Sequence, residues 1–227
     1  MTPTTTPDPA TAPPRRRKPG RAVRIANVPW DMYEGVLKAF GDRRGVRVTY
    51  DRGELEIMVP SQEHEKDGEF LARLIVIMTE EFGLPLQHGG STTLKRKGMK
   101  KGLEPDKCFW IASAARVAGV AKLNLKIHPP PDLAIEVDVT RSSLDRLGIY
   151  RSLGVGELWR LEGDDLQFYA LGADKKYAPT ATSSVFPGVA PSDLMAFVKQ
   201  ARTAMNQNTP AAAFRAWARQ LATKPPQ

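Results

Sequence analysis

Hydrophobic and polar positions alternate with a period of two in several short segments, which predicts β-strands. Residues 47–50 and 54–59 alternate around a turn that contains Gly53, so they predict a β-hairpin. Further strands are expected around 84–95 and 104–111, and at 132–139, 157–161 and 166–171.

A period of three to four residues marks the predicted helices. One helix is expected over 30–40, after Pro29, and another begins near Ser61. Three more are expected at 142–153, 192–205 and 211–223. Because strands and helices alternate along the chain, the pattern predicts an α/β fold.

The first 21 residues follow neither period. They are rich in Pro, Thr and Ala and end in a run of arginine and lysine, a composition that predicts a disordered basic tail. Such a tail either binds nucleic acid or serves only as a solvated leader. Residues 22–227 show no internal repeat and no clean linker, so we expect them to form one domain.

The composition is that of an ordinary globular protein, with 41% hydrophobic and 26% charged residues among 227. The longest apolar runs fall far short of the roughly 20 residues that cross a bilayer. The single cysteine excludes an internal disulfide, and no Cys/His cluster has zinc spacing. With no secretory signal visible, the sequence predicts a cytoplasmic protein without membrane association.

The net charge of +8 lies partly in the tail, so the remaining domain is only mildly basic. This balance favours a polyanionic partner but is a weak signal alone. Cations gather in one loop that contains glycine: Lys95, Arg96, Lys97, Lys100 and Lys101. Such a loop can hold a nucleic-acid backbone, whereas a solvated hairpin tip explains any one of these side chains equally well.

Carboxylates share one face of the strand predicted at 132–139. Leu133, Ile135 and Val137 fall on one face, and Asp132, Ala134, Glu136 and Asp138 fall on the other. Because neighbouring carboxylates repel one another and are costly to desolvate, a divalent cation is the simplest compensation. Oxygen ligands of this kind suit Mg²⁺ or Mn²⁺. The competing interpretation is an edge strand whose polar face meets water.

Other polar residues stand near this strand in the sequence. Asp106 begins another apolar strand, directly after the basic loop. Arg146 and Tyr150 lie four residues apart and share a face of the next helix. Asp145 follows Ser142 at the spacing of a helix cap, so capping is its simplest role.

Taken together, these motifs resemble the Uma-two family of the PD-(D/E)XK nuclease superfamily. The motifs are, in order, Pro60-Ser-Gln-Glu-His64-Glu, Gly90-Ser-Thr-Thr, Glu104-Pro-Asp106, Pro131-Asp-Leu-Ala-Ile-Glu136-Val, Asp145-Arg with Tyr150 and Glu157-Leu-Trp159, and Phe186-Pro with Pro191-Ser-Asp-Leu. The resemblance covers about residues 22–220. It implies a restriction-endonuclease-like core, in which a mixed central sheet is flanked by helices and two neighbouring strands carry a metal site.

The resemblance also implies roles for individual residues. Asp106 matches the family's central metal-binding aspartate, and Glu136 matches the acidic residue of the (D/E)XK half-motif. His64 matches a characteristic histidine at the first core helix, where Glu65 is an additional candidate ligand and Tyr150 lies at the edge of the site. From the residues alone, a packing or capping role for His64 is the simpler explanation.

One position departs from the superfamily pattern. The third residue of the half-motif should be lysine, and here it is Asp138. In the family, a lysine usually comes instead from the following helix, four residues before the tyrosine, and that position is Arg146 here. Arginine stabilises negative charge but stays protonated, so it is a poor proton shuttle. Either the chemistry needs only positive charge there, or activity is weakened or lost.

The resemblance therefore implies a Mg²⁺- or Mn²⁺-dependent endonuclease that hydrolyses phosphodiester bonds in DNA. Asp106 and Glu136, with Asp138 and a backbone carbonyl, would hold the metal, and Arg146 would stabilise the transition state. The basic loop would contact the DNA backbone. Two alternatives stay open: an inactive nucleic-acid-binding module with the same fold, and a protein-interaction domain. A homodimer is an expectation from the fold only.

Overall fold

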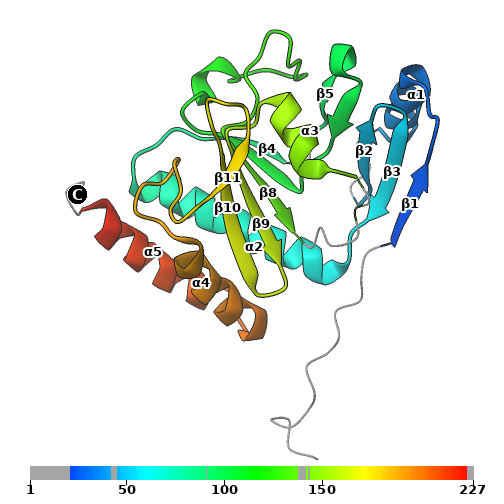
Figure 1. Cartoon of the computed structure of the whole chain (residues 1–227). Helices are drawn as coiled ribbons and strands as arrows, with labels where there is room; N and C mark the ends of the chain where they lie inside the picture. Colours follow the sequence, from blue (N-terminus) through cyan, green and yellow to red (C-terminus); the bar gives the residue numbers. More distant parts are fainter. Residues whose placement is uncertain (1–20, 42–44, 91, 138–141, 143, 224–227) are drawn as a thin grey trace, which may run out of the picture.

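The computed structural model describes residues 21–41, 45–90, 92–137, 142 and 144–223, and the statements below concern those residues. Residues 1–20 of the predicted tail, and Asp138, lie outside them. The chain forms two β-sheets with helices packed against them (Figure 1). The predicted mixed α/β fold is therefore confirmed.

The smaller sheet comes from the N-terminal half of the chain. Its strands are β1 (Arg21–Ile25), β2 (Arg47–Asp51), β3 (Glu54–Val59), β5 (Leu94–Arg96) and β6 (Lys101–Leu103). Their order is β1-β3-β2-β6-β5, and neighbouring strands run antiparallel. Helix α1 (Trp30–Phe40) packs on this sheet around a small aromatic core.

The predicted hairpin is confirmed as β2 and β3. Arg52 and Gly53 form its two-residue turn, with φ angles of 49° and 101°. This turn needs left-handed backbone at both central positions, which glycine adopts without strain. The hairpin therefore follows from the sequence pattern and its turn chemistry.

The sequence pattern does not predict β1. This strand pairs with β3 from Arg21 onward, so the predicted tail boundary at residue 21 is too late. Residues 22–25 of β1 are exposed, and the strand is held by backbone pairing at the edge of the sheet. No burial pattern was therefore available to mark it.

The larger sheet is mixed, as the resemblance implies. Its strands are β4 (Gln87–Gly90), β7 (Lys107–Trp110), β8 (Leu133–Val137), β9 (Glu157–Glu162), β10 (Asp165–Leu171) and β11 (Tyr177–Thr180). Their order is β11-β10-β9-β8-β7-β4, with β8 and β9 parallel and the other pairs antiparallel. Strand β11 of this sheet and strand β6 of the smaller one are two further elements that the pattern does not predict.

Helices lie on both faces of the larger sheet (Figure 1). The helices α2 (Gln62–Glu81), α4 (Pro191–Thr203) and α5 (Asn208–Ala222) share the main hydrophobic core with one face. Helix α3 (Arg146–Leu153) links β8 to β9 and belongs to a second core on the other face. None of the helices within the described ranges is long and apolar enough to cross a membrane.

Strand β8 divides its side chains between these two cores, as its alternation predicts. Leu133, Ile135 and Val137 pack into the main core with α2. Ala134 packs into the second core with Tyr150 of α3. The next residue on the α3 side is Glu136, which is also buried.

The segment from β4 to β7 crosses between the sheets twice. Strand β4 belongs to the larger sheet, β5 and β6 belong to the smaller one, and β7 returns to the larger. The short extended pieces predicted around 84–95 are thus two strands, β4 and β5, which belong to different sheets. Glu104, Pro105 and Asp106 form the second crossing, so Asp106 stands between the two sheets.

Helix α3 begins later than predicted. The pattern predicts a start at residue 142, but the helix starts at Arg146, because Asp145 is its N-cap and accepts a hydrogen bond from the Gly148 N–H at 2.9 Å. Gly148 has no Cβ, and a Cβ there would collide with the Asp145 carboxylate. The capping role predicted for Asp145 is confirmed, with Asp145 as the cap itself.

Candidate active site

Asp106 lies at the centre of the candidate site. Its side chain is buried, and its Oδ2 accepts a hydrogen bond of 2.9 Å from the Val137 N–H of β8. The register of β7 on β8 pairs Lys107 with Ile135, which places Asp106 beside Glu136. Two neighbouring strands therefore bring together the two carboxylates that the sequence predicts as metal ligands.

Glu136 is held by helix α3. Its Oε1 accepts hydrogen bonds from Arg146 Nη2 and from the Tyr150 hydroxyl. All three side chains are buried. The predicted shared face of Arg146 and Tyr150 is thus confirmed, and this face points at Glu136.

Arg146 also joins the two sheets. Its Nη1 donates to Thr49 Oγ1 of β2, and its Nη2 lies 3.3 Å from the Glu104 carbonyl oxygen, which accepts a hydrogen bond from it. The guanidinium therefore contacts β2 of the smaller sheet, the segment 104–106 that crosses between the sheets, and β8. These three hydrogen bonds need several donors in one plane, which the guanidinium of arginine provides and the ammonium of lysine does not.

His64 stands at the N-terminus of α2, where its backbone N–H donates to the Ser61 side chain at 3.2 Å. Its side chain is buried, and its Nε2 lies 3.1 Å from Asp106 Oδ2. The capping function at this helix end belongs to Ser61. The His64 ring therefore lies beside Asp106 at the candidate site.

The sequence pattern misses Arg47, which approaches Asp106 from β2. Its Nε lies 3.4 Å from Asp106 Oδ1, and its Nη2 lies 3.0 Å from Glu65 Oε1. Glu65 is thus near the site, but its carboxylate pairs with Arg47. In β2, Arg47 and Thr49 alternate with Val48 and Tyr50, so the two polar side chains share one face of the strand. This polar face was the signal in the sequence that could have identified Arg47 and Thr49 as site residues.

Burial and neighbouring charges shift the pKa of the two carboxyl groups in opposite directions. For Asp106, burial alone would raise the pKa, but the His64 side chain and the Val137 N–H outweigh it, so the pKa lies below its usual value. For Glu136, burial dominates and raises the pKa, although the Arg146 guanidinium works against it. Asp106 is therefore the more strongly ionised of the pair.

The pKa of His64 is raised. Burial alone would lower it, but the Asp106 carboxylate, with Glu136 and Glu65 further away, outweighs burial. A protonated imidazole beside Asp106 is therefore favoured at neutral pH more than for an ordinary histidine.

Several buried polar atoms at this site make no hydrogen bond. Within the described residues, nine buried side-chain nitrogen or oxygen atoms have no hydrogen-bond partner, and five belong here: Arg47 Nε, His64 Nδ1, His64 Nε2, Asp106 Oδ1 and Arg146 Nε. Three of the five nevertheless lie in the ion pairs of Asp106 with Arg47 and His64. Because folded proteins pair nearly all buried polar atoms, the remaining two, His64 Nδ1 and Arg146 Nε, are free to meet a polar ligand.

The donor set fits one divalent cation held mainly by Asp106 and Glu136. Asp106 Oδ1 is buried and accepts no hydrogen bond, although Arg47 Nε lies 3.4 Å from it, and both hydrogen bonds described for Glu136 go to Oε1. Within the described chain, no cluster of three or more His, Cys, Asp or Glu side chains could hold a metal. Mg²⁺ commonly binds through one or two carboxylates and completes its shell with water and phosphate oxygens, so two carboxylates suffice.

The carboxylate of Asp132, which directly precedes β8, makes its contacts away from Asp106 and Glu136. Asp132 Oδ2 instead accepts hydrogen bonds from the Ile111 and Ser113 N–H groups at 2.6 and 3.0 Å. It fixes the loop after β7, so the prediction that Asp132 shares a metal face is wrong. Asp138, the other predicted ligand on this face, lies outside the described residues.

The basic loop splits into paired and unpaired cations. Lys101 Nζ lies 3.1 Å from Asp51 Oδ2, and Lys95 Nζ lies 2.8 Å from Glu34 Oε1. Lys97 Nζ is 3.7 Å from an exposed aspartate of α1. Within the described residues, no ion pair involves Arg96 or Lys100, so the five cations do not form one equivalent set.

Comparison with known proteins places these observations in context. Residues 30–202 match the model of the Uma2 family, which is described as "Putative restriction endonuclease". No curated protein sequence matches the chain significantly. The fold is similar to that of an Anabaena variabilis protein described as a putative nuclease, with a TM-score of 0.51 and 13% identity over 77% of this chain and 99% of the other. At this identity the similarity shows the fold alone.

Proposed function

Since the chain belongs to the Uma2 family, we propose that it is an endonuclease that hydrolyses phosphodiester bonds in DNA with Mg²⁺ or Mn²⁺. The observation that carries the proposal is that two buried carboxylates, Asp106 and Glu136, stand beside each other on neighbouring strands, each against a buried arginine. Neighbouring carboxylates beside guanidinium groups suit a cation and a phosphate together.

Asp106 and Glu136 are the proposed metal ligands. When bound, a divalent cation activates a water molecule and offsets negative charge on the phosphate. His64 lies against Asp106 Oδ2 and Val137 donates to the same oxygen, while Arg47 Nε lies 3.4 Å from Oδ1. His64 is therefore a positioning residue for Asp106 in this proposal.

Arg146 and Arg47 supply fixed positive charge. Neither can act as a general base, because a guanidinium stays protonated. Both are buried beside the carboxylates, with Arg47 paired to Asp106 and Arg146 paired to Glu136. Their proposed role is to bind the phosphate and to stabilise the charge that develops on it in the transition state.

The test is cleavage of supercoiled plasmid by the full chain, with Mg²⁺, with Mn²⁺ and with EDTA. We expect metal-dependent nicking that is lost in Asp106→Asn and Glu136→Gln. Glu162→Gln removes an exposed carboxylate at the end of β9 and should leave cleavage unchanged. Cleavage that persists in EDTA, or in both site variants, would refute the proposal.

A nucleic-acid-binding module without turnover is the second candidate. It is favoured by the ion pair between Arg146 and Glu136, which already neutralises one of the two carboxylates. DNA binding without cleavage by the wild-type chain would identify this candidate. Restoration of cleavage by Arg146→Lys would then locate the loss of activity at this one position.

A further inference from the structure

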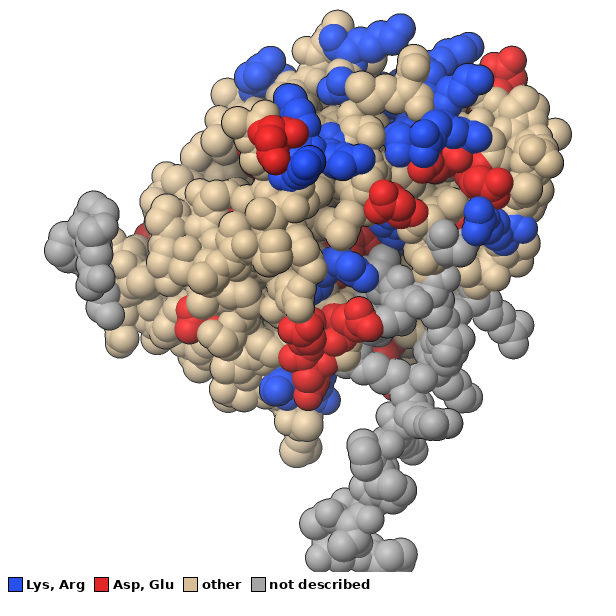
Figure 2. Space-filling view, viewed as in Figure 1, with Lys and Arg blue, Asp and Glu red and all other residues tan. Residues whose placement is uncertain are grey.

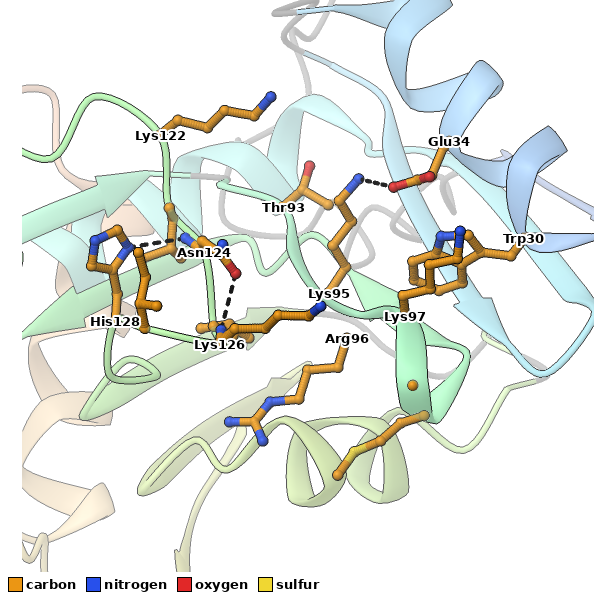
Figure 3. A pocket seen from close by; sticks show the side chains of 15 residues that line it. Trp30, Glu34, Thr93, Lys95, Arg96, Lys97, Lys122, Asn124, Lys126 and His128 are labelled. Carbon is orange, nitrogen blue, oxygen red and sulfur yellow. Dashed lines mark hydrogen bonds and ion pairs between the residues drawn. The ribbon is translucent and has the colours of Figure 1, made fainter.

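A cavity of about 990 Å³ opens between two segments that are far apart in the sequence (Figure 3). One wall is β5 with the turn that follows it, and the other is the loop 122–128. The charged side chains that line it are five cations, Lys95, Arg96, Lys97, Lys122 and Lys126, and one carboxylate, Glu34. We call this space the basic cavity.

Much of this positive charge has no partner in the protein. Lys95 pairs with Glu34, but no ion pair within the described residues involves Arg96, Lys122 or Lys126. Arg96 Nε is also buried and has no hydrogen-bond partner. Figure 2 shows lysine and arginine side chains gathered toward the top of the view, with carboxylates interspersed among them. An unneutralised basic hollow attracts a polyanion.

The loop wall is held in a defined shape. The Asn124 N–H donates to His128 Nδ1 at 3.0 Å, and the Lys126 N–H donates to Asn124 Oδ1 at 3.0 Å. The His128 N–H closes the turn by donating to the Asn124 carbonyl oxygen at 2.8 Å. These bonds fix the backbone that carries Lys126, so only its side chain remains to be ordered when it meets a ligand.

The basic cavity shares a wall with the candidate active site. Thr93 lines the cavity, and its hydroxyl donates to Glu104 Oε1 at 2.9 Å. The carbonyl oxygen of Glu104 in turn accepts the hydrogen bond from Arg146. A ligand in the cavity therefore lies beside the residue that positions Arg146 against Glu136.

We propose that the basic cavity binds the phosphodiester backbone of a nucleic-acid strand that passes the active site. Figure 3 shows Lys122, Lys126 and Arg96 reaching different parts of the cavity, which suits a row of phosphates better than a single anion. Ile127 and Met99 line the same space with exposed apolar surface, which suits sugars and bases. The inference rests on the proposed function for its choice of polyanion.

Lys122 and Lys126 carry the test, because both are exposed and neither belongs to the proposed metal site. We compare Lys122→Ser/Lys126→Ser with Arg73→Ser/Lys199→Ser, which removes the same charge from the exposed surfaces of α2 and α4. Binding of fluorescently labelled DNA is measured by anisotropy in EDTA over a range of salt concentrations. Circular dichroism checks that both variants fold.

The cavity variant should bind DNA more weakly, and the slope of log affinity against log salt should fall by about one unit per lysine. The control should keep the wild-type slope. Equal loss in both variants, or no loss in either, would overturn the proposal. Displacement of labelled DNA by inorganic phosphate as effectively as by unlabelled DNA would overturn it in favour of a small-anion site.

Plasmid cleavage measured in parallel separates this inference from the proposed nuclease. If the cavity variant raises KM for DNA and leaves kcat near wild type, the result supports both the DNA-binding cavity and the nuclease activity. Cavity-dependent DNA binding without any cleavage would uphold the cavity and reject the nuclease. Cleavage with unchanged KM in the cavity variant would uphold the nuclease and reject the cavity as its binding surface.

Discussion

Two arginines offset the negative charges of the buried carboxylates at the site. Each arginine comes from a different element of the fold. Arg47 comes from β2 and lies beside Asp106, while Arg146 comes from α3 and pairs with Glu136. Both guanidinium groups are buried. A buried charge without its partner is costly, so these pairs set the stability of the site as well as its chemistry.

The Arg146 pair is testable by a double-mutant cycle. Arg146→Gln leaves Glu136 buried with Tyr150 as its remaining hydrogen-bond donor, which should lower the free energy of unfolding by about 3–5 kcal/mol. Adding Glu136→Gln removes the stranded charge, so the double variant should be more stable than the two single effects predict. Urea denaturation measures the free energy of unfolding of wild type, of both single variants and of the double variant.

Arg146→Lys is the matched control for that cycle. It keeps the positive charge, but an ammonium does not reproduce the fork to Thr49, Glu104 and Glu136. We expect its stability to lie between those of wild type and Arg146→Gln. Strict additivity in the cycle would contradict the buried ion pair.

At the scale of elements, the end of α2 depends on a distant helix. Glu80 and Glu81 stand in its last turn, where the helix dipole disfavours negative charge and where no cation lies in the same turn. Arg215 and Arg219 of α5 supply the missing charge, with Arg219 Nε 2.9 Å from Glu81 Oε2. The ion pairs therefore dock α5 on α2.

This docking predicts a dependence of stability on acid. The two arginines lower the pKa of Glu81 from its usual 4.5 to about 2. A lowered folded-state pKa contributes stability that is complete above the usual value and is lost as the pH falls through the lowered one. Glu81→Gln should therefore destabilise the protein at neutral pH, and the difference from wild type should shrink below about pH 4.5 and vanish near pH 2.

Thermal denaturation across this pH range measures the difference. In a chain that carries Arg215→Gln and Arg219→Gln, the Glu81→Gln change should have almost no pH-dependent effect, because its partners are absent. A wild-type difference that grows as the pH falls would contradict the ion-pair explanation.

At the scale of the molecule, the periodic elements could be predicted from the sequence, but their meeting points could not. The hairpin, the faces of β8 and the pairing of Arg146 with Tyr150 follow from local alternation and helical spacing. Strand β1 has no buried face, so nothing local marks it. Arg47 reaches Asp106 only because β2 meets residues 104–106. Lys122 and Lys95 line one cavity only because the loop 122–128 lies across from β5.

The candidate site lies at the junction of the two sheets, and this position predicts how a metal would act on the whole molecule. A ligand that binds only the folded chain stabilises it by about 2.7 kcal/mol at about 100 times its Kd. Mg²⁺ should therefore raise the melting temperature of wild type and of Glu162→Gln. Mg²⁺ should leave the melting temperatures of Asp106→Asn and Glu136→Gln unchanged.

Hydrogen exchange locates that effect. Because Asp106 lies between the sheets and Arg47 and Arg146 link them, Mg²⁺ should slow amide exchange in β2 as well as in β8. The distant helix α5 should change much less. Protection confined to β8, or spread equally over α5, would show that the junction does not couple the two sheets to the site.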